Sequence, residues 1–231
     1  MTGLLTPRRR RGIELLDDPA IDPEVIKRSM SDVVRSNVVF GGTRAAMAEL
    51  RPAILKLGGS GTLLDVGTGA GDIPATARHA ATQVGVSLWT IGIDAAEPLI
   101  SANRIRNSVV VRGNALQLPF RDRSVDIVMC SQVLHHFRAN DAVALVREMN
   151  RVARARVVIS DLRRSWLAAS GLWAASFVLG FHPISRHDGV VSVMRGFVCV
   201  ELADIVEAAI GVRPAVRRRP GFRLTTSWKP Q

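Results

Sequence analysis

The sequence predicts an α/β fold in which a mostly parallel sheet carries helices on both faces. Beyond Gly61, short apolar runs alternate with stretches of helical periodicity. Several of these runs end in a polar residue directly before a loop, as at Asp65 and Asp94. The chain has 231 residues and is 47% apolar, so one sizeable core can be buried. Repeated strand–helix units give a parallel sheet because a parallel neighbour requires a crossover connection.

Seven segments are predicted strands. They are residues 62–66, 87–94, 108–114, 124–131, 155–161, 215–218 and 222–228. A tight Arg-Pro-Gly turn separates the last two, which we therefore expect to form an antiparallel hairpin at the sheet edge.

Helical patterns lie before, between and after these strands. Residues 22–57 are predicted helical, with Asp22 as N-cap, Pro23 in the first turn and a break at Gly41-Gly42. Further helices are predicted from Ile73 and over 97–103, 142–152, 166–181 and 199–210. The chain is thus expected to divide into a basic arm and helical N-terminal cap (1–57) and one α/β domain (58–231) with a lid around 163–198.

The net charge of +11 is carried almost wholly by arginine, with runs at Arg8–Arg11 and Arg217–Arg219. Such runs suit phosphates or an anionic membrane surface, but they are also typical of a solvated arm and strand face. No nucleic-acid-binding module accompanies them and the chain has no tyrosine, which argues against a nucleic-acid partner.

The uncharged segment 166–181 is about 16 residues long, shorter than the roughly 20 needed to cross a bilayer. It is predicted to be a buried or pocket-lining helix, and peripheral membrane contact stays open because Arg163 and Arg164 precede it. Cys130 and Cys199 have no disulfide or metal spacing, and the N-terminus lacks an apolar signal core. We therefore expect a cytoplasmic protein.

The glycine loop "LLDVGTGAGDIP", residues 63–74, follows the first strand and faces the carboxyl edge of the sheet, where ligands bind in such folds. A P-loop is excluded because no Gly-Lys-Ser/Thr ending is present. A dinucleotide site is disfavoured because Asp72 stands where a pyrophosphate would approach the helix start. Acidic residues on both sides of the loop, Asp65 and Asp72, suit a cationic, zwitterionic ligand instead.

From Thr62 to Asp161 the chain resembles the class I S-adenosylmethionine-dependent methyltransferases, which have a Rossmann-like fold. "LLDVGTGAG" is similar to their first motif, "GNALQLPF" to the segment bordering the adenine, and "VDIVMCSQVLHHF" to the fourth-strand motif facing the methyl group. The resemblance implies that Asp94 holds the ribose hydroxyls and that Asn114, in place of the usual aspartate, contacts the adenine. It implies S-adenosylmethionine as cofactor and S-adenosylhomocysteine as product. The residues expected to bind the cofactor are Asp65, Gly67, Thr68, Gly69, Gly71, Asp94, Ala95, Asn114, Ala115, Leu116, Ser131, Gln132 and, by analogy, Arg44.

His135 and His136 directly follow the fourth predicted strand, where the methyl acceptor is expected. A neutral histidine can assist deprotonation of a phenol, and which of the two would act is left open. Some quinone-pathway O-methyltransferases bind a divalent ion here through a Glu-x-x-Glu-His motif. Because Gln132, His135 and His136 offer no carboxylate at these positions, no metal is expected.

The lid region supplies the remaining candidates. His187, paired with Asp188, is an alternative base, and Arg195 lies on the same polar stretch. Trp173 and Phe177 of the apolar helix are predicted to line the acceptor pocket, which would suit an aromatic or lipid-like molecule.

The sequence is also similar to small bacterial methyltransferases acting on quinone precursors and phenolic polyketides. It therefore predicts methyl transfer to an apolar aromatic small molecule, at a phenolic oxygen of a polyketide or quinone-like secondary metabolite. Carbon methylation of a quinone precursor, RNA methylation and non-catalytic nucleoside binding remain alternatives, as do monomer and homodimer.

Overall fold

The computed structural model describes residues 6–10, 12–18, 20–96 and 109–231, and its centre is one seven-stranded sheet. The strand order is β3-β2-β1-β4-β5-β7-β6. The bounds are β1 Ser60–Val66, β2 Ser87–Asp94, β3 Val109–Arg112, β4 Val125–Ser131, β5 Ala153–Leu162, β6 Arg217–Arg219 and β7 Arg223–Trp228. The predicted fold class and all seven predicted strands are confirmed.

Strands β1 to β5 run parallel, and β7 pairs antiparallel with both β5 and β6. The predicted hairpin is therefore present, with β6 at the edge of the sheet. Its turn requires glycine: Gly221 has φ 75°, and an added Cβ would lie 1.9 Å from the carbonyl oxygen of Phe40. This close approach packs the hairpin turn against the end of the first helix.

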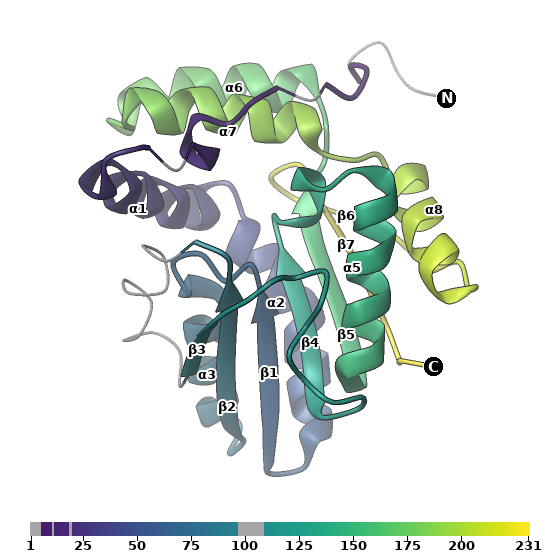
Figure 1. The fold of residues 1–231 in the computed structure, drawn as a ribbon. Helices are drawn as coiled ribbons and strands as arrows, with labels where there is room; N and C mark the ends of the chain where they lie inside the picture. Colours follow the sequence, from purple (N-terminus) through teal and green to yellow (C-terminus); the bar gives the residue numbers. More distant parts are fainter. Residues whose placement is uncertain (1–5, 11, 19, 97–108) are drawn as a thin grey trace.

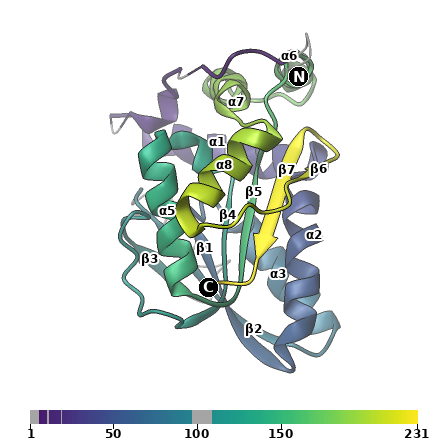
Figure 2. The same cartoon turned by 90° about the vertical axis from the view of Figure 1, so that its right-hand side faces the viewer.

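Helices cover both faces of the sheet (Figures 1 and 2). On one face lie α2 (Gly42–Ile54) and α3 (Asp72–Gln83), whose buried Leu50 and Ala77 pack on Leu63 and Ile127. On the other lie α5 (Ala139–Val152) and α8 (Cys199–Ile210). Burial on both faces explains why the strands are almost continuously apolar.

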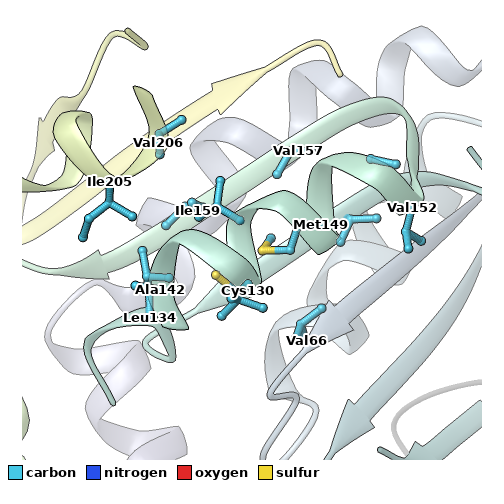
Figure 3. Close-up of a cluster of buried hydrophobic side chains, with 14 of the residues drawn as sticks. Val66, Cys130, Leu134, Ala142, Met149, Val152, Val157, Ile159, Ile205 and Val206 are labelled. Atoms are coloured by element: carbon cyan, nitrogen blue, oxygen red, sulfur yellow. The ribbon is translucent and has the colours of Figure 1, made fainter. Parts of the chain in front are cut away.

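The helical period predicted for α5 is confirmed by its burial (Figure 3). Its buried residues are Ala142, Leu145, Val146, Met149 and Val152. They meet Cys130 and Ile159 of the sheet and Val206 of α8 in the larger of two core clusters.

A second group of helices lies over the carboxyl ends of the strands (Figure 1). We call this group the cap; it is not the same as the N-terminal cap predicted over residues 1–57. It contains η1 (Leu15–Asp17), α1 (Pro23–Val39), α6 (Trp166–Val178) and α7 (Pro183–Arg195). Asp22 caps α1 as predicted, accepting a hydrogen bond of 2.8 Å from the Glu24 N–H. Short 3-10 helices η2 (Leu55–Leu57) and η3 (Leu134–His136) complete the described elements.

The stretch 182–197, expected as a polar lid segment, contains helix α7. Pro183 occupies its first turn, and the His182 ring accepts a hydrogen bond from the Ile184 N–H (3.3 Å). The helix buries only Asp188, Val193 and Met194, so its sequence shows little of the apolar periodicity by which a helix is recognised.

The described part of the basic arm lies across the cap. The Arg10 N–H donates to the Met194 carbonyl (3.2 Å), and Arg164 Nε donates to that of Pro7 (2.8 Å). Arg9 Nε donates to the carbonyl oxygen of Arg195 (2.7 Å). These contacts bind the arm to α7 and to the end of β5. The helix predicted over 97–103 lies outside the described residues.

Within the described ranges, no helix combines the length and the apolar composition needed to cross a membrane.

Candidate functional site

A cavity of about 1290 Å³ separates the cap from the carboxyl ends of the strands. Its floor is made by the loops that follow β1, β2, β3 and β4, and its roof by α1, α6 and α7. The order of the strands reverses between β1 and β4, which is where ligands bind in open parallel sheets.

The glycine loop lies on this floor. Gly67 (φ 70°), Gly69 (φ 50°) and Gly71 (φ 69°) all adopt the left-handed conformation that favours glycine. A Cβ on Gly67 would lie 2.4 Å from Val133, whereas one on Gly69 would meet nothing within 4 Å. Because Gly69 lines the cavity, its missing side chain leaves the backbone open to a ligand.

Asp94 ends β2 beside this loop, as predicted. Its Oδ2 accepts from the Gly69 N–H (3.0 Å), and its Oδ1 from the Ala96 N–H (3.1 Å). Asp94 and Ala95 line the cavity, and the carboxylate keeps lone pairs for further donors. A diol that donates two hydrogen bonds fits this group.

Asp65 is a buried carboxyl on the same floor. Burial raises its pKa to about 8, Thr68 opposes this by hydrogen bonding, and the charges of Asp72 and Asp94 add to the rise. In the part of the chain that the structure describes, Oδ1 has no hydrogen-bond partner although the residue borders the cavity. An unsatisfied buried carboxyl of this kind fits a cationic ligand group.

The "GNALQLPF" segment places Asn114 and Ala115 on the cavity wall but turns Leu116 against the hydrophobic core. The Asn114 Oδ1 accepts from the Leu116 N–H (2.9 Å), so the side chain also closes its own turn. The Leu116 side chain packs against the core and does not line the cavity, and its contact with the cofactor stays a prediction.

Ser131 and Gln132 border the cavity where β4 ends. Gln132 has φ 57°, a left-handed conformation that is rare for a residue with a side chain and frequent at functional sites. Its amide nitrogen donates to Asn37 of α1, and its amide oxygen accepts from Arg223 of β7 (2.9 Å). Asn37 in turn donates to Asp72 (3.1 Å), which links the cap to the glycine loop.

Arg223 is a buried cation that lines the cavity and is only 3% exposed. Burial lowers its pKa to about 10, while the charge of Asp161 opposes the shift. No described residue accepts a hydrogen bond from its Nε. This guanidinium is therefore a candidate group for the anionic part of a ligand.

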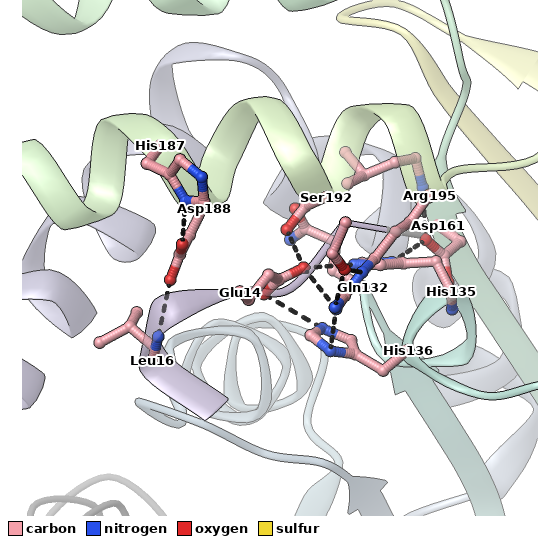
Figure 4. A network of polar contacts seen from close by, with 12 residues as sticks. Glu14, Leu16, Gln132, His135, His136, Asp161, His187, Asp188, Ser192 and Arg195 are labelled. Atoms are coloured by element: carbon pink, nitrogen blue, oxygen red, sulfur yellow. Dashed lines mark hydrogen bonds and ion pairs between the residues drawn. The ribbon is translucent and has the colours of Figure 1, made fainter. Parts of the chain in front are cut away.

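His135 and Asp161 form a buried pair beside the cavity, which His135 lines (Figure 4). His135 Nδ1 lies 2.7 Å from Asp161 Oδ1, and the side chains are 1% and 0% exposed. Burial by itself raises the pKa of Asp161, but the charge and hydrogen bond of His135 outweigh it and lower the pKa. In the neutral form of the imidazole, this carboxylate accepts the Nδ1 proton and the lone pair is on Nε2.

His135 Nε2 has no hydrogen-bond partner among the described residues. Glu14 Oε1 lies 4.0 Å from this atom, and Glu14 also lines the cavity. A buried imidazole lone pair bordered by a carboxylate is suited to take a proton, because the carboxylate stabilises the positive charge that results.

In His136 the Nδ1 atom faces a cation, whereas in His135 it faces a carboxylate. Arg195 Nη1 lies 3.2 Å from its Nδ1 and can only donate, so the ring proton is on Nε2, 3.8 Å from Glu14 Oε2. Burial, together with the charges of His135 and Arg195, lowers the pKa of His136 to about 3. This ring therefore stays neutral, and its only acceptor nitrogen is already engaged.

One ligand atom each from Glu14, His135 and His136 lies within 4.8 Å of the others, so the carboxylate that the sequence pattern lacked comes from the N-terminal segment. Glu14 Oε1, however, accepts hydrogen bonds from Ser192 (2.7 Å) and Arg195 (2.9 Å). A permanent guanidinium charge inside the cluster opposes a divalent cation, and the residues fit a hydrogen-bonded network better than a metal site.

Four other predicted site residues do not line the cavity, although one of them, Arg195, contacts Glu14 and His136, which do. The His187 side chain is 49% exposed and, like Arg195, is not part of the cavity wall. Trp173 and Phe177 are 54% and 50% exposed, and they pack edge to face on the outer side of α6. The cavity is lined instead by Leu167, Ala168, Gly171 and Leu172. Both faces of this helix are apolar, so the sequence did not distinguish them.

Two more predicted residues are Arg44 and Asp188. Arg44 is exposed on α2 and does not border the cavity. Asp188 does border it and pairs with His187 as predicted, with Oδ1 2.8 Å from His187 Nδ1. Its two oxygens also accept from the N–H groups of Leu15 and Leu16 (2.8 and 2.9 Å) and so hold η1 against α7.

Sequence reasoning missed Glu14, Asn37, Asp161 and Arg223. Asp161 could have been found, because it lies near the end of a strand by the same rule that identified Asp94. The other three reach the site from segments far away in sequence, and no local pattern marks them.

Comparison with known proteins agrees with this geometry. Residues 64–159 match a family model described as a methyltransferase domain. A demethylmenaquinone methyltransferase of Roseiflexus sp. is 33% identical over 126 residues, 49% of this chain and 48% of the relative. A probable tRNA methyltransferase 9B of Bos taurus is 32% identical over 91 residues, 39% of this chain and 18% of the relative. The chain thus spans less than half the length of either relative.

The fold comparison extends over nearly the whole chain. A SAM-dependent methyltransferase from Aquifex aeolicus has a TM-score of 0.63 at 19% identity, with 91% of this chain and 100% of that chain covered. Residues 64–159 are therefore similar to methyltransferase domains, and the chain has the fold of the class I S-adenosylmethionine-dependent methyltransferases.

Proposed function

We propose that this protein transfers a methyl group from S-adenosylmethionine to the phenolic oxygen of an apolar aromatic small molecule. The observation that carries the proposal is the single cavity that joins the glycine loop and Asp94 to the buried His135–Asp161 pair. One end has the donors and acceptors of a nucleoside site, and the other has a base.

The residues on the cavity floor fit the cofactor. The loop Gly67–Gly71 would admit it, Asp94 would hold the ribose diol, and Asn114 and Ala115 would border the adenine. The unsatisfied carboxyl of Asp65 and guanidinium of Arg223 complement the ammonium and carboxylate of its amino-acid part. When bound, the cofactor supplies an electrophilic methyl group on a sulfonium sulfur.

His135 is the proposed general base. Its Nε2 lone pair would accept the phenolic proton as the oxygen takes the methyl group from the sulfonium. His135 would then pass that proton to solvent, and the products would be an aryl methyl ether and S-adenosylhomocysteine. Asp161 holds the imidazole in the required tautomer and stabilises its positive charge.

The acceptor class rests on the apolar roof of the cavity, which includes Leu167, Leu172, Phe181 and Val193. The name of the Roseiflexus relative, demethylmenaquinone methyltransferase, supports a quinone-type acceptor. Methylation at a ring carbon of such a phenol would also begin with removal of the phenolic proton, but the ring carbon would then have to lose its own hydrogen. Which product forms depends first on which atom faces the methyl group.

The test is methyl transfer from labelled S-adenosylmethionine to a panel of phenols and hydroquinones, with unmodified tRNA as competing acceptor. We expect label in an organic-extractable methyl ether, identified by mass spectrometry and NMR. Label at a ring carbon would reassign the acceptor atom. Label only in tRNA would overturn the small-molecule proposal, and binding of S-adenosylhomocysteine without transfer to any acceptor would overturn the enzymatic one.

A further inference from the structure

Helix α6 exposes an apolar face to solvent. Its outward large side chains are Trp166 (44% exposed), Leu167 (57%), Trp173 (54%), Phe177 (50%) and Val178 (90%). At about 100° per residue these positions fall on one continuous arc of the helix, shared with small residues and no charge. The opposite side buries Ala169 and Ser176 against the cap.

This arrangement inverts the usual pattern of a surface helix, whose outward side is polar. Contiguous exposed apolar surface of this kind marks an interaction site. Figures 1 and 2 both place α6 at the outermost edge of the cap, on the side away from the sheet. Trp166 and Trp173 are of the residue type enriched at membrane–water interfaces.

Arginines stand at both ends of the apolar face. The Arg10 guanidinium lies 5.5 Å from the ring centre of Trp166, and that of Arg186 lies 3.6 Å from the ring centre of Phe177. Segments 6–14 and 163–195 contain two acidic residues, Glu14 and Asp188, and both are buried. The charge that these segments present around the apolar face is therefore positive.

The same face borders the cavity. Leu167 and Gly171 are exposed on α6 and also belong to the cavity lining. An apolar molecule lying against α6 would thus be next to the cavity wall.

We propose that the outer face of α6, with Arg10, the neighbouring exposed Arg8 and Arg186 of α7, is a docking surface for an anionic lipid bilayer. The helix lies in the plane of the interface, with its aromatic side chains among the acyl chains and the arginines at the phosphates. Docking does not depend on the methyl-transfer chemistry. If the proposed function holds, an apolar acceptor would enter the cavity from the bilayer.

Co-sedimentation of the full chain with vesicles tests the proposal. We expect binding to vesicles that contain phosphatidylglycerol, weaker binding to phosphatidylcholine alone, and loss of binding as salt rises. Trp173→Ser combined with Phe177→Ser should weaken binding about tenfold or more, because both aromatic side chains leave the interface. Arg8→Gln with Arg10→Gln should weaken binding to anionic vesicles only.

Trp89→Ser is the matched control, because Trp89 on β2 is also 54% exposed and lies in the sheet, outside the cap. Retained S-adenosylhomocysteine binding and circular dichroism would show that each variant folds. Equal vesicle binding by the Trp173→Ser/Phe177→Ser variant and the Trp89→Ser control would overturn the proposal. Absence of binding of the wild-type chain to anionic vesicles would also overturn the proposal. This includes the case in which the chain does not bind vesicles but forms a dimer that the α6 substitutions dissociate.

Discussion

The two ends of the cavity are built from different kinds of sequence. The cofactor end consists of loops that directly follow neighbouring strands, and its central contact joins residues 25 positions apart, Gly69 and Asp94. At the acceptor end, Glu14 meets Arg195 across 181 positions and His135 meets Asp161 across 26. The first end depends on backbone conformation and the second on side chains brought together by the cap.

Because of this difference, substitutions at the two ends of the cavity should affect different properties of the protein. Glycines with positive φ and a strand-end carboxylate are required wherever the backbone must approach a ligand closely. The acceptor end depends on charges that compensate one another in a buried place, so a single substitution there leaves a partner unsatisfied. Substitutions at the cofactor end should therefore change cofactor affinity, and those at the acceptor end should change turnover.

The largest expected effect is at the acceptor end. His135→Gln should lower turnover of a phenolic acceptor by about 10² to 10⁴, the usual contribution of a general base, and leave S-adenosylhomocysteine affinity unchanged. His136→Gln is the control and should change turnover less than about tenfold, because the acceptor nitrogen of His136 is engaged by Arg195. A chelator should have no effect on either rate. Steady-state kinetics measures turnover, and calorimetry measures S-adenosylhomocysteine affinity. An equal loss of turnover in the two variants would refute the distinction between the histidines.

The next effect is at the cofactor end. Asp94→Ala removes a carboxylate expected to accept two ribose hydroxyls, so S-adenosylhomocysteine affinity should fall about 100-fold. Asp204→Ala, on α8 and 56% exposed, is the matched control and should bind normally. Calorimetry measures both. If Asp94→Ala kept wild-type affinity, the nucleoside site would lie elsewhere.

The last effect is a pH dependence at Asp65, comparable in size with that of Asp94→Ala. With a pKa of about 8 its carboxyl is protonated below that pH, and an ammonium group binds the ionised form. S-adenosylhomocysteine affinity should therefore rise about tenfold per pH unit between about pH 6 and pH 8 and then level off. Methylthioadenosine, which lacks the amino-acid part, should show no such rise.

The control variant for this comparison is Asp65→Asn, in which the rise should disappear. Arg223→Gln should weaken S-adenosylhomocysteine but not methylthioadenosine, since only the former carries a carboxylate. A pH-independent wild-type affinity would contradict the role of Asp65, and equal weakening of both ligands would assign Arg223 to the acceptor.

Most of the fold could be predicted from the sequence because its signals are local. Strands such as 87–94 are apolar runs that end in a polar residue, and α5 repeats its apolar residues at the helical period. Helix α7 was not predicted as a helix because it buries only three residues. The side of α6 that lines the cavity was predicted wrongly because both faces of this helix are apolar.

By itself, the sequence determined the cofactor end of this protein. Gly67, Gly69 and Asp94 follow directly after their strands, so chain connectivity and backbone sterics bring them together. Only the tertiary structure decided the acceptor end, including which histidine keeps a free lone pair. That choice depends on Asp161 facing one ring and Arg195 facing the other. The physical reason is that hydrogen bonding and burial set the protonation of an imidazole. Here they depend on Glu14 and Arg195, which no local pattern connects to the histidines, as well as on Asp161.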